Sequence, residues 1–427
     1  VFAVAVAEHP SFPPFPVQAM ASQQSPPPPP APTTVIDLGN DLLREIFLRL
    51  PSLPSLVRAA LSCRTFLDAV RSSPAFRRSF SAARPPPLLG LFFDPDEPSI
   101  PTFAPLRRRS DPDLAAVVRG ADFFLTRLPD DDDDDDTFPG WAIEDCRDGY
   151  VLLRNCNTEQ FAAYNPLTRA LDLIASPPEE IFDDFHRDVT YLGCNILSSK
   201  KAGEPLRLVF TYHDESRARA AVFSSESREW QIFPWSEPVT PHPEDKYWLK
   251  VGNMVNGFIY WIHANEAYIL VLNTATLEFS QMDLPPSLVG RHFIFRIGEN
   301  KDGELCIVCP IEFDLFVWVW RAGLDGIEMW MFDKRFSLER IVDFTGGTLE
   351  EHGELKVVAI IDGYVYFSTR ETFVDAHFPC WFLSVCMDTS VVDMIFRRRF
   401  DSHVHPYIMA WPPSLIENKV HPQLEDA

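Results

Sequence analysis

The sequence predicts a mainly β protein with a small α-helical domain near its beginning. Residues 35–84 carry apolar side chains at helical spacing, and the chain from residue 88 onward repeats short β-rich runs separated by polar turns. With 427 residues, 46% of them hydrophobic, the chain is long enough for one small and one large domain. We expect four parts: a segment at 1–34, a helical domain at 35–84, a β domain at 88–415 and a tail at 416–427.

The first part is expected to be a disordered tether. Five consecutive prolines, Pro26 to Pro30, stand among Ser, Gln and Thr, a composition that favours extended polyproline geometry and buries little surface. Met20 precedes this run, which suggests that residues 1–19 are upstream sequence rather than part of the fold.

Charge and hydropathy exclude several classes of partner. The formal net charge is −23, so an acidic surface should repel phosphate backbones, and no nucleic-acid partner is expected. No apolar run is long enough to span a bilayer, and no membrane partner is expected. The eight cysteines are spread thinly, unlike the dense disulfide frameworks of secreted domains, and we interpret them as reduced thiols. We expect a protein of the cytoplasm, the nucleus or both.

The helical domain is predicted to contain three or four short helices. Asn40 can cap a helix that ends at Pro51, and its apolar residues form one stripe, Leu42, Leu43, Ile46, Phe47 and Leu50. A second helix begins near Ser55, and Pro74 opens a last short one. So small a unit cannot hide all of its apolar surface, so another protein or domain should cover part of it. The alternative is a helical cap packed on its own chain.

The charge of the helical domain favours a partner. Residues 35–84 carry eight Arg against four acidic residues, a net charge of +4 inside an acidic chain. A basic module of this kind suits an acidic partner.

This domain resembles an F-box. Residues 35–51, 56–60 and 62–66 read VIDLGNDLLREIFLRLP, LVRAA and SCRTF, which match the family at many fixed spacings. Two positions depart from the family pattern. The usual Leu-Pro entry is Leu38-Gly39 here, and the usual Trp after Cys-Arg is Phe66.

The resemblance implies that these helices dock on the Skp-type adaptor of a ubiquitin ligase and, through it, on a cullin. Cys63 would then be a small buried apolar residue rather than a nucleophile. The residues expected to bind the adaptor are Leu38, Leu42, Leu43, Ile46, Phe47, Leu50, Pro51, Leu56, Val57, Ala60, Cys63 and Phe66.

The β domain repeats with a period near fifty residues. Gly149, Gly257, Gly303 and Gly363 each end an Asp-Gly or Asn-Gly pair and precede a β-rich run, and they are separated by 108, 46 and 60 residues. The gap of 108 is about two periods, and the strand-like run 206–210 lies near its middle. Within each period a second strand reaches a polar turn and a third strand leaves it.

Small sheets that repeat in this way predict a β-propeller. Five units share this order, an earlier degenerate unit begins at residues 88–93, and a lone strand at 407–411 ends the chain, so we expect six blades, with five or seven as alternatives. A pair of β-sandwiches is a competing fold, but it would not need the recurring order. The region is similar to the propeller-like F-box-associated domains of plants.

No metal, cofactor or catalytic site is expected. Cys306 and Cys309 have metal-ligand spacing, but in a strand their side chains face opposite ways. His403 and His405 share one face of an extended stretch without an apparent third ligand, and we interpret them as surface histidines. The seven acids 130–136 are interpreted as a solvated loop, and no nucleophile elbow or phosphate-binding glycine loop is present.

These observations favour a non-catalytic substrate receptor that binds an adaptor through its helices and an unidentified target protein through its propeller. One alternative is a propeller hydrolase with a helical appendage, using carboxylates at one end of a central channel. Another is an F-box scaffold that is not linked to degradation.

Overall fold

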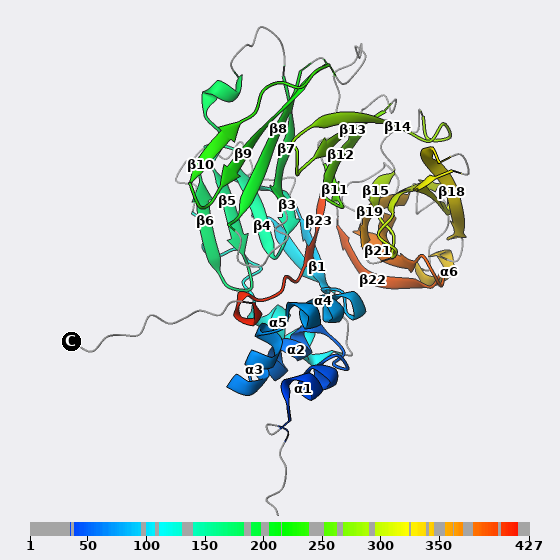
Figure 1. Ribbon diagram of the computed structural model, residues 1–427. Coiled ribbons are helices and arrows are strands. Elements are labelled where there is room, and N and C mark those ends of the chain that lie inside the picture. Colours follow the sequence, from blue (N-terminus) through cyan, green and yellow to red (C-terminus); the bar gives the residue numbers. More distant parts are fainter. Residues whose placement is uncertain are drawn as a thin grey trace, which may run out of the picture.

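The protein is a ring of six β-sheets with a helical unit at one end (Figure 1). The structure, a computed structural model, describes residues 35, 38–94, 100–106, 111–129, 140–182, 189–197, 205–214, 216–238, 252–262, 268–289, 295–323, 326–338, 341–345, 355–361, 363–369, 379–399 and 403–416. The expected tether at 1–34 and the acidic run 130–136 lie outside these residues. No helix in the described part of the chain has the length and apolarity to cross a lipid bilayer.

Four short helices form the helical unit. They are α1 (Asn40–Phe47), α2 (Leu53–Ala60), α3 (Arg64–Arg71) and α4 (Pro74–Ala83). The Ser52 hydroxyl caps α2 by accepting a hydrogen bond from the Ser55 amide, and Ser73 caps α4 in the same way. The expected cap of the first helix is wrong by one residue, because Gly39 occupies that position and Asn40 is already helical.

Five of the six sheets each have four antiparallel strands that follow one another along the chain. Their strands are β3 (Trp141–Arg147), β4 (Tyr150–Asn155), β5 (Phe161–Asn165), β6 (Ala170–Ile174); β7 (Thr190–Leu197), β8 (Arg207–His213), β9 (Ala218–Ser224), β10 (Glu229–Ile232); β11 (Asn253–Val255), β12 (Phe258–Ile262), β13 (Tyr268–Asn273), β14 (Phe279–Asp283); β15 (Arg296–Glu299), β16 (Leu305–Ile311), β17 (Asp314–Ala322), β18 (Glu328–Ser337); and β19 (Leu355–Ile361), β20 (Tyr364–Thr369), β21 (Pro379–Cys386), β22 (Val392–Arg399). The first strand of each sheet lies innermost. The prediction of a mainly β fold with six blades is confirmed.

The sixth sheet joins the two ends of the domain. Strand β1 (Leu88–Phe93) pairs with β2 (Thr102–Pro105) on one side and with the last strand, β23 (Val404–Ile408), on the other. Strand β23 takes the inner position and packs beside β3. The degenerate first unit and the lone final strand that the sequence indicates are therefore parts of one blade.

Short elements outside the blades complete the fold. They are α5 (Pro112–Gly120), η2 (Glu179–Phe182), α6 (Ile341–Thr345) and η3 (Pro413–Leu415).

Tight turns connect inner strands to their neighbours. Asp148 and Gly149 both have positive φ, 51° and 80°, and Asn256 and Gly257 repeat this pair at 50° and 82°. These values fit the type I′ turns that Asp-Gly and Asn-Gly favour. A Cβ atom at Gly149 would lie 2.8 Å from the Cβ of Ala410, in the segment that follows β23.

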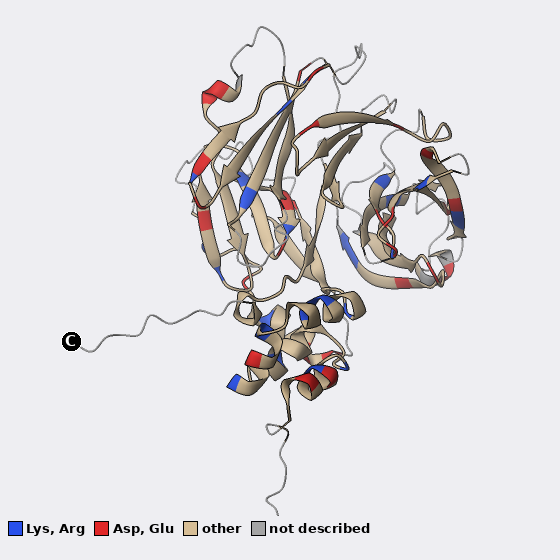
Figure 2. Ribbon diagram, viewed as in Figure 1, with Lys and Arg blue, Asp and Glu red and all other residues tan. Residues whose placement is uncertain are grey.

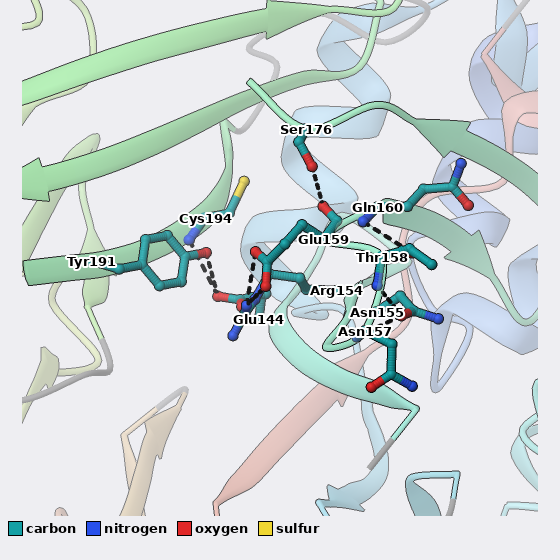
Figure 3. Close-up of polar contacts among 10 residues, drawn as sticks. All are labelled: Glu144, Arg154, Asn155, Asn157, Thr158, Glu159, Gln160, Ser176, Tyr191 and Cys194. Atoms are coloured by element: carbon teal, nitrogen blue, oxygen red, sulfur yellow. Dashed lines mark hydrogen bonds and ion pairs between the residues drawn. The ribbon is translucent and has the colours of Figure 1, made fainter. Parts of the chain in front are cut away.

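A buried carboxylate joins the first blade to the second (Figure 3). Glu144, at a β-bulge of β3, accepts hydrogen bonds from Arg154 Nε at 2.8 Å, from the Tyr191 hydroxyl at 2.9 Å and from the Cys194 amide at 3.3 Å. Its side chain is 12% exposed, and burial and the Glu144 charge raise the pKa of Tyr191 well above its ordinary value. Glu159 binds the other side of Arg154 from the surface.

Gly149→Ala should destabilise the protein more than Gly257→Ala. Both changes place a Cβ on a left-handed residue, at a cost of roughly 1–2 kcal/mol. Only the first also forces a contact with Ala410, which adds about 1–3 kcal/mol. Urea unfolding of both variants tests this, and equal midpoints would contradict close packing at the ring closure.

Glu144→Gln should lower the free energy of unfolding by about 1–3 kcal/mol, because it leaves the half-buried Arg154 without its inner carboxylate. Glu159→Gln is the matched control. Glu159 pairs with the same guanidinium but is 58% exposed, so its loss should cost under about 1 kcal/mol. Thermal and urea unfolding compare the two variants, and a larger loss for the control would refute the assignment.

Candidate functional site

The twelve expected adaptor-binding residues differ in burial: some are buried, some are partly buried and three face solvent. Leu43, Phe47, Leu56 and Ala60 are buried in the core of the helical unit. Leu38, Leu50, Val57 and Phe66 are partly buried against that core, and Cys63 is half-buried. The residues that face solvent are Leu42, Ile46 and Pro51.

The outer face of α1 is apolar and exposed. Leu42 is 54% exposed and Ile46 is 39% exposed, and they lie one turn apart on the same side of the helix. The adjacent side, about 100° around the helix, carries Leu43 and Phe47, and the Phe47 ring packs edge-on against Phe66 at 5.4 Å between ring centres. The predicted stripe is thus two surfaces, of which one builds the helical unit and one remains available.

Leu61 is a further exposed apolar residue of the helical unit that is not among the twelve expected adaptor-binding residues. It follows α2 directly and is 55% exposed. Leu61 continues the apolar pattern of α2, although the helix ends at Ala60. The sequence pattern alone therefore does not distinguish it from the buried residues of that helix.

Several arginines of the helical unit hold the fold. Arg44 joins α1 to α3, because its Nε donates to the Ala69 carbonyl at 2.9 Å and its Nη2 donates to the Ser72 hydroxyl at 2.9 Å. Arg77 and Arg84 also donate to backbone carbonyls within the unit. Arg49 remains accessible to a partner, because its side chain is largely exposed. Figure 2 shows that basic and acidic positions both occur on the helices of this unit.

The helical unit is fixed to the propeller by polar and aromatic contacts. The Trp411 indole N–H donates to the Ser81 hydroxyl at 2.8 Å, and its ring lies 5.9 Å from that of Phe80. At α5, Asp113 accepts hydrogen bonds from Arg58 at 2.8 Å and from Ser55 at 2.9 Å, and these bonds lower the pKa of Asp113. These partners lie 55 to 331 residues apart in sequence, so no local pattern could have indicated them.

A central channel of about 1260 Å³ runs along the propeller axis. The inner strands β3, β11, β15, β19 and β23 line it, and Arg77, Arg78 and Ser81 of α4 lie at one end. Two carboxylates of β3 reach this channel, but both are hydrogen-bonded between blades. Glu144 accepts from the Tyr191 hydroxyl at 2.9 Å, and Asp145 accepts from the Ile196 amide at 2.9 Å.

The metal-like spacings lead to no metal site among the residues that the structure describes. Cys306 and Cys309 are buried in different apolar clusters, on opposite faces of their sheet. The expectation of a surface histidine is wrong for His405, which is 7% exposed with its Nε2 3.1 Å from Asp94 Oδ2. Strand β23 occupies the inner position of its blade, where even a polar side chain is enclosed.

Comparison with family models identifies both domains. A model described as "F-box protein AT5G49610-like, beta-propeller" matches residues 142–415, and a model of the F-box domain matches residues 35–78. A search of curated proteins finds no match.

Solved structures with a related shape are distant. A protein of unknown function from Bacteroides caccae is 9% identical, with 63% of this chain and 89% of that chain covered and a TM-score of 0.36. The β-propeller domain of Myceliophteria thermophila Cps50 (Swd1) is 8% identical, with 61% and 73% covered and a TM-score of 0.33. At such values the likeness says nothing about function.

The family matches agree with the resemblance that the sequence carries. An F-box combined with a propeller supports a general role as a substrate-recognition adaptor. Since the propeller model alone spans more than half of the chain and an F-box precedes it, the protein belongs to the AT5G49610-like family of F-box proteins with a β-propeller.

Proposed function

We propose that the protein is the substrate-recognition subunit of a Skp-cullin-F-box ubiquitin ligase. The observation that carries this proposal is the exposed outer face of α1, where Leu42 and Ile46 remain in solvent although the adjacent face, with Leu43 and Phe47, is buried. Burying such side chains against a partner yields about 1.5–3 kcal/mol each when the burial is complete. A Skp-type adaptor, and a cullin bound through it, would occupy this side of the helical unit.

The subunit would act by placing a target rather than by bond chemistry. The contacts of Trp411, just after β23, with α4 hold the helical unit and the propeller in one orientation. A target on the blades would therefore be held at a defined distance from the ubiquitin-loaded enzyme of the assembly, which raises the effective concentration of its lysines. We place this activity in the cytoplasm, the nucleus or both.

The double variant Leu42→Asp, Ile46→Asp should lose co-purification with a Skp-type adaptor. Each change puts a charge where the proposed interface is apolar, and we expect a loss of affinity of roughly a hundredfold or more. Quantitative pull-down or calorimetry with purified adaptor measures it. Leu43 and Phe47 are unsuitable for this test, because they are buried and a charge there would unfold the helices.

The matched control is Met331→Asp, which places a charge on an exposed apolar residue of β18. Both proteins should keep the unfolding midpoint of the parent. Undiminished adaptor binding by the double variant would refute the proposed docking face, and equal loss in the control would point to a general charge effect.

A further inference from the structure

The central channel has two chemically different ends. Asn256, after β11, donates to the carbonyl of Gly303, after β15, at 2.7 Å, and Gly149, after β3, lies against Ala410, after β23. The final residues of the inner strands therefore share one end, which is the end occupied by the helical unit because Trp411 packs on α4. The first residues of the inner strands form the opposite end, which we call the distal end.

Arg296 lies at the distal end as the first residue of β15, and it lines the channel. Its Nε donates to the Val357 carbonyl of β19 at 3.3 Å, and burial lowers the pKa of its guanidinium. Among the described residues, no carboxylate forms an ion pair with it. Arg147, at the other end of the channel, differs in having Asp145 Oδ2 at 3.7 Å from its Nε.

His403 lies near Arg296 at the same end of the channel. His403 lines the channel just before β23, and its pKa is lowered to about 4 by burial and by the neighbouring His405, Arg296 and Lys356. Asp94 is the carboxylate that acts on His403, and it is already engaged with the Ile143 amide and with His405. Among the residues that the structure describes, Arg296 is therefore a channel-lining cation with no carboxylate paired to it, in a protein whose net charge is −23.

We propose that the distal end of the channel binds an anionic group, a carboxylate or a phosphate, between the Arg296 guanidinium and the His403 imidazole. A partly enclosed guanidinium without a counter-charge is costly, and its planar fork of donors fits carboxylate and phosphate oxygens. Nε is held by Val357, so the outer nitrogens are positioned to donate to a ligand in the channel. The helices lie at the other end, and the proposal does not depend on adaptor docking.

The test uses the full chain, titrated separately with inorganic phosphate and with succinate at constant ionic strength. The ring signals of His403, assigned with a His403→Gln variant, report binding by nuclear magnetic resonance. A bound anion should raise the pKa of His403 from about 4 by roughly one pH unit or more, because it offsets the neighbouring cations. Saturable stabilisation against heat should accompany it.

Arg296→Gln should weaken anion binding by roughly tenfold or more, since it removes a charge-assisted hydrogen bond. Arg207→Gln is the control, because Arg207 is exposed at the start of β8 and does not line the channel. A response to phosphate alone assigns a phosphoryl ligand, a response to succinate alone assigns a carboxylate, and a response to both assigns a general anion site.

Two results would overturn the proposal. One is the absence of any saturable change at His403 with either anion. The other is equal weakening by Arg296→Gln and Arg207→Gln. Should Arg296→Gln fail to fold, the His403→Gln variant decides, because loss of the imidazole donor should also weaken binding measured by thermal stabilisation.

Discussion

The antiparallel pairing of β23 with β1 is the contact on which the rest of the molecule depends. Without it, the sixth blade would lack its inner strand, and β1 would expose an unpaired edge. Because β23 is the last strand, the same pairing carries the following residues onto the helical unit, where Trp411 meets Phe80 and Ser414 accepts from Arg71. One set of backbone hydrogen bonds thus closes the ring and fixes the helices relative to the channel.

The channel walls use charged residues in two ways. Glu144 and Asp145 accept hydrogen bonds across the boundary between the first two blades. Their carboxylates therefore stabilise the packing of these two blades. Arg296 has no carboxylate partner of this kind among the described residues, although it stands on an equivalent inner strand. A charged side chain that is paired within the fold stabilises the protein. A charged side chain without such a pair can bind a ligand of opposite charge.

The helical unit shows the same division on a smaller scale. Leu42 and Leu43 are neighbours in sequence and alike in chemistry, yet one is exposed and the other is fully buried. Successive residues of an α-helix point about 100° apart, so a stripe two residues wide has one edge toward the core and one toward solvent. The arginines divide likewise, because Arg44 holds α1 to α3 while the side chain of Arg49 is largely exposed.

The local pattern was enough to predict the helices, the five regular blades and the F-box resemblance, because helical spacing and the Asp-Gly and Asn-Gly turns act between near neighbours in the chain. It could not indicate that β1 pairs with β23, that Trp411 binds Ser81, or that His405 is enclosed beside Asp94. It also could not separate Leu42 from Leu43. The three long-range contacts depend on which segments, hundreds of residues apart, meet when the ring closes. The difference between Leu42 and Leu43 depends on how α1 packs against α3. Both are decided by burial in three dimensions rather than by sequence spacing.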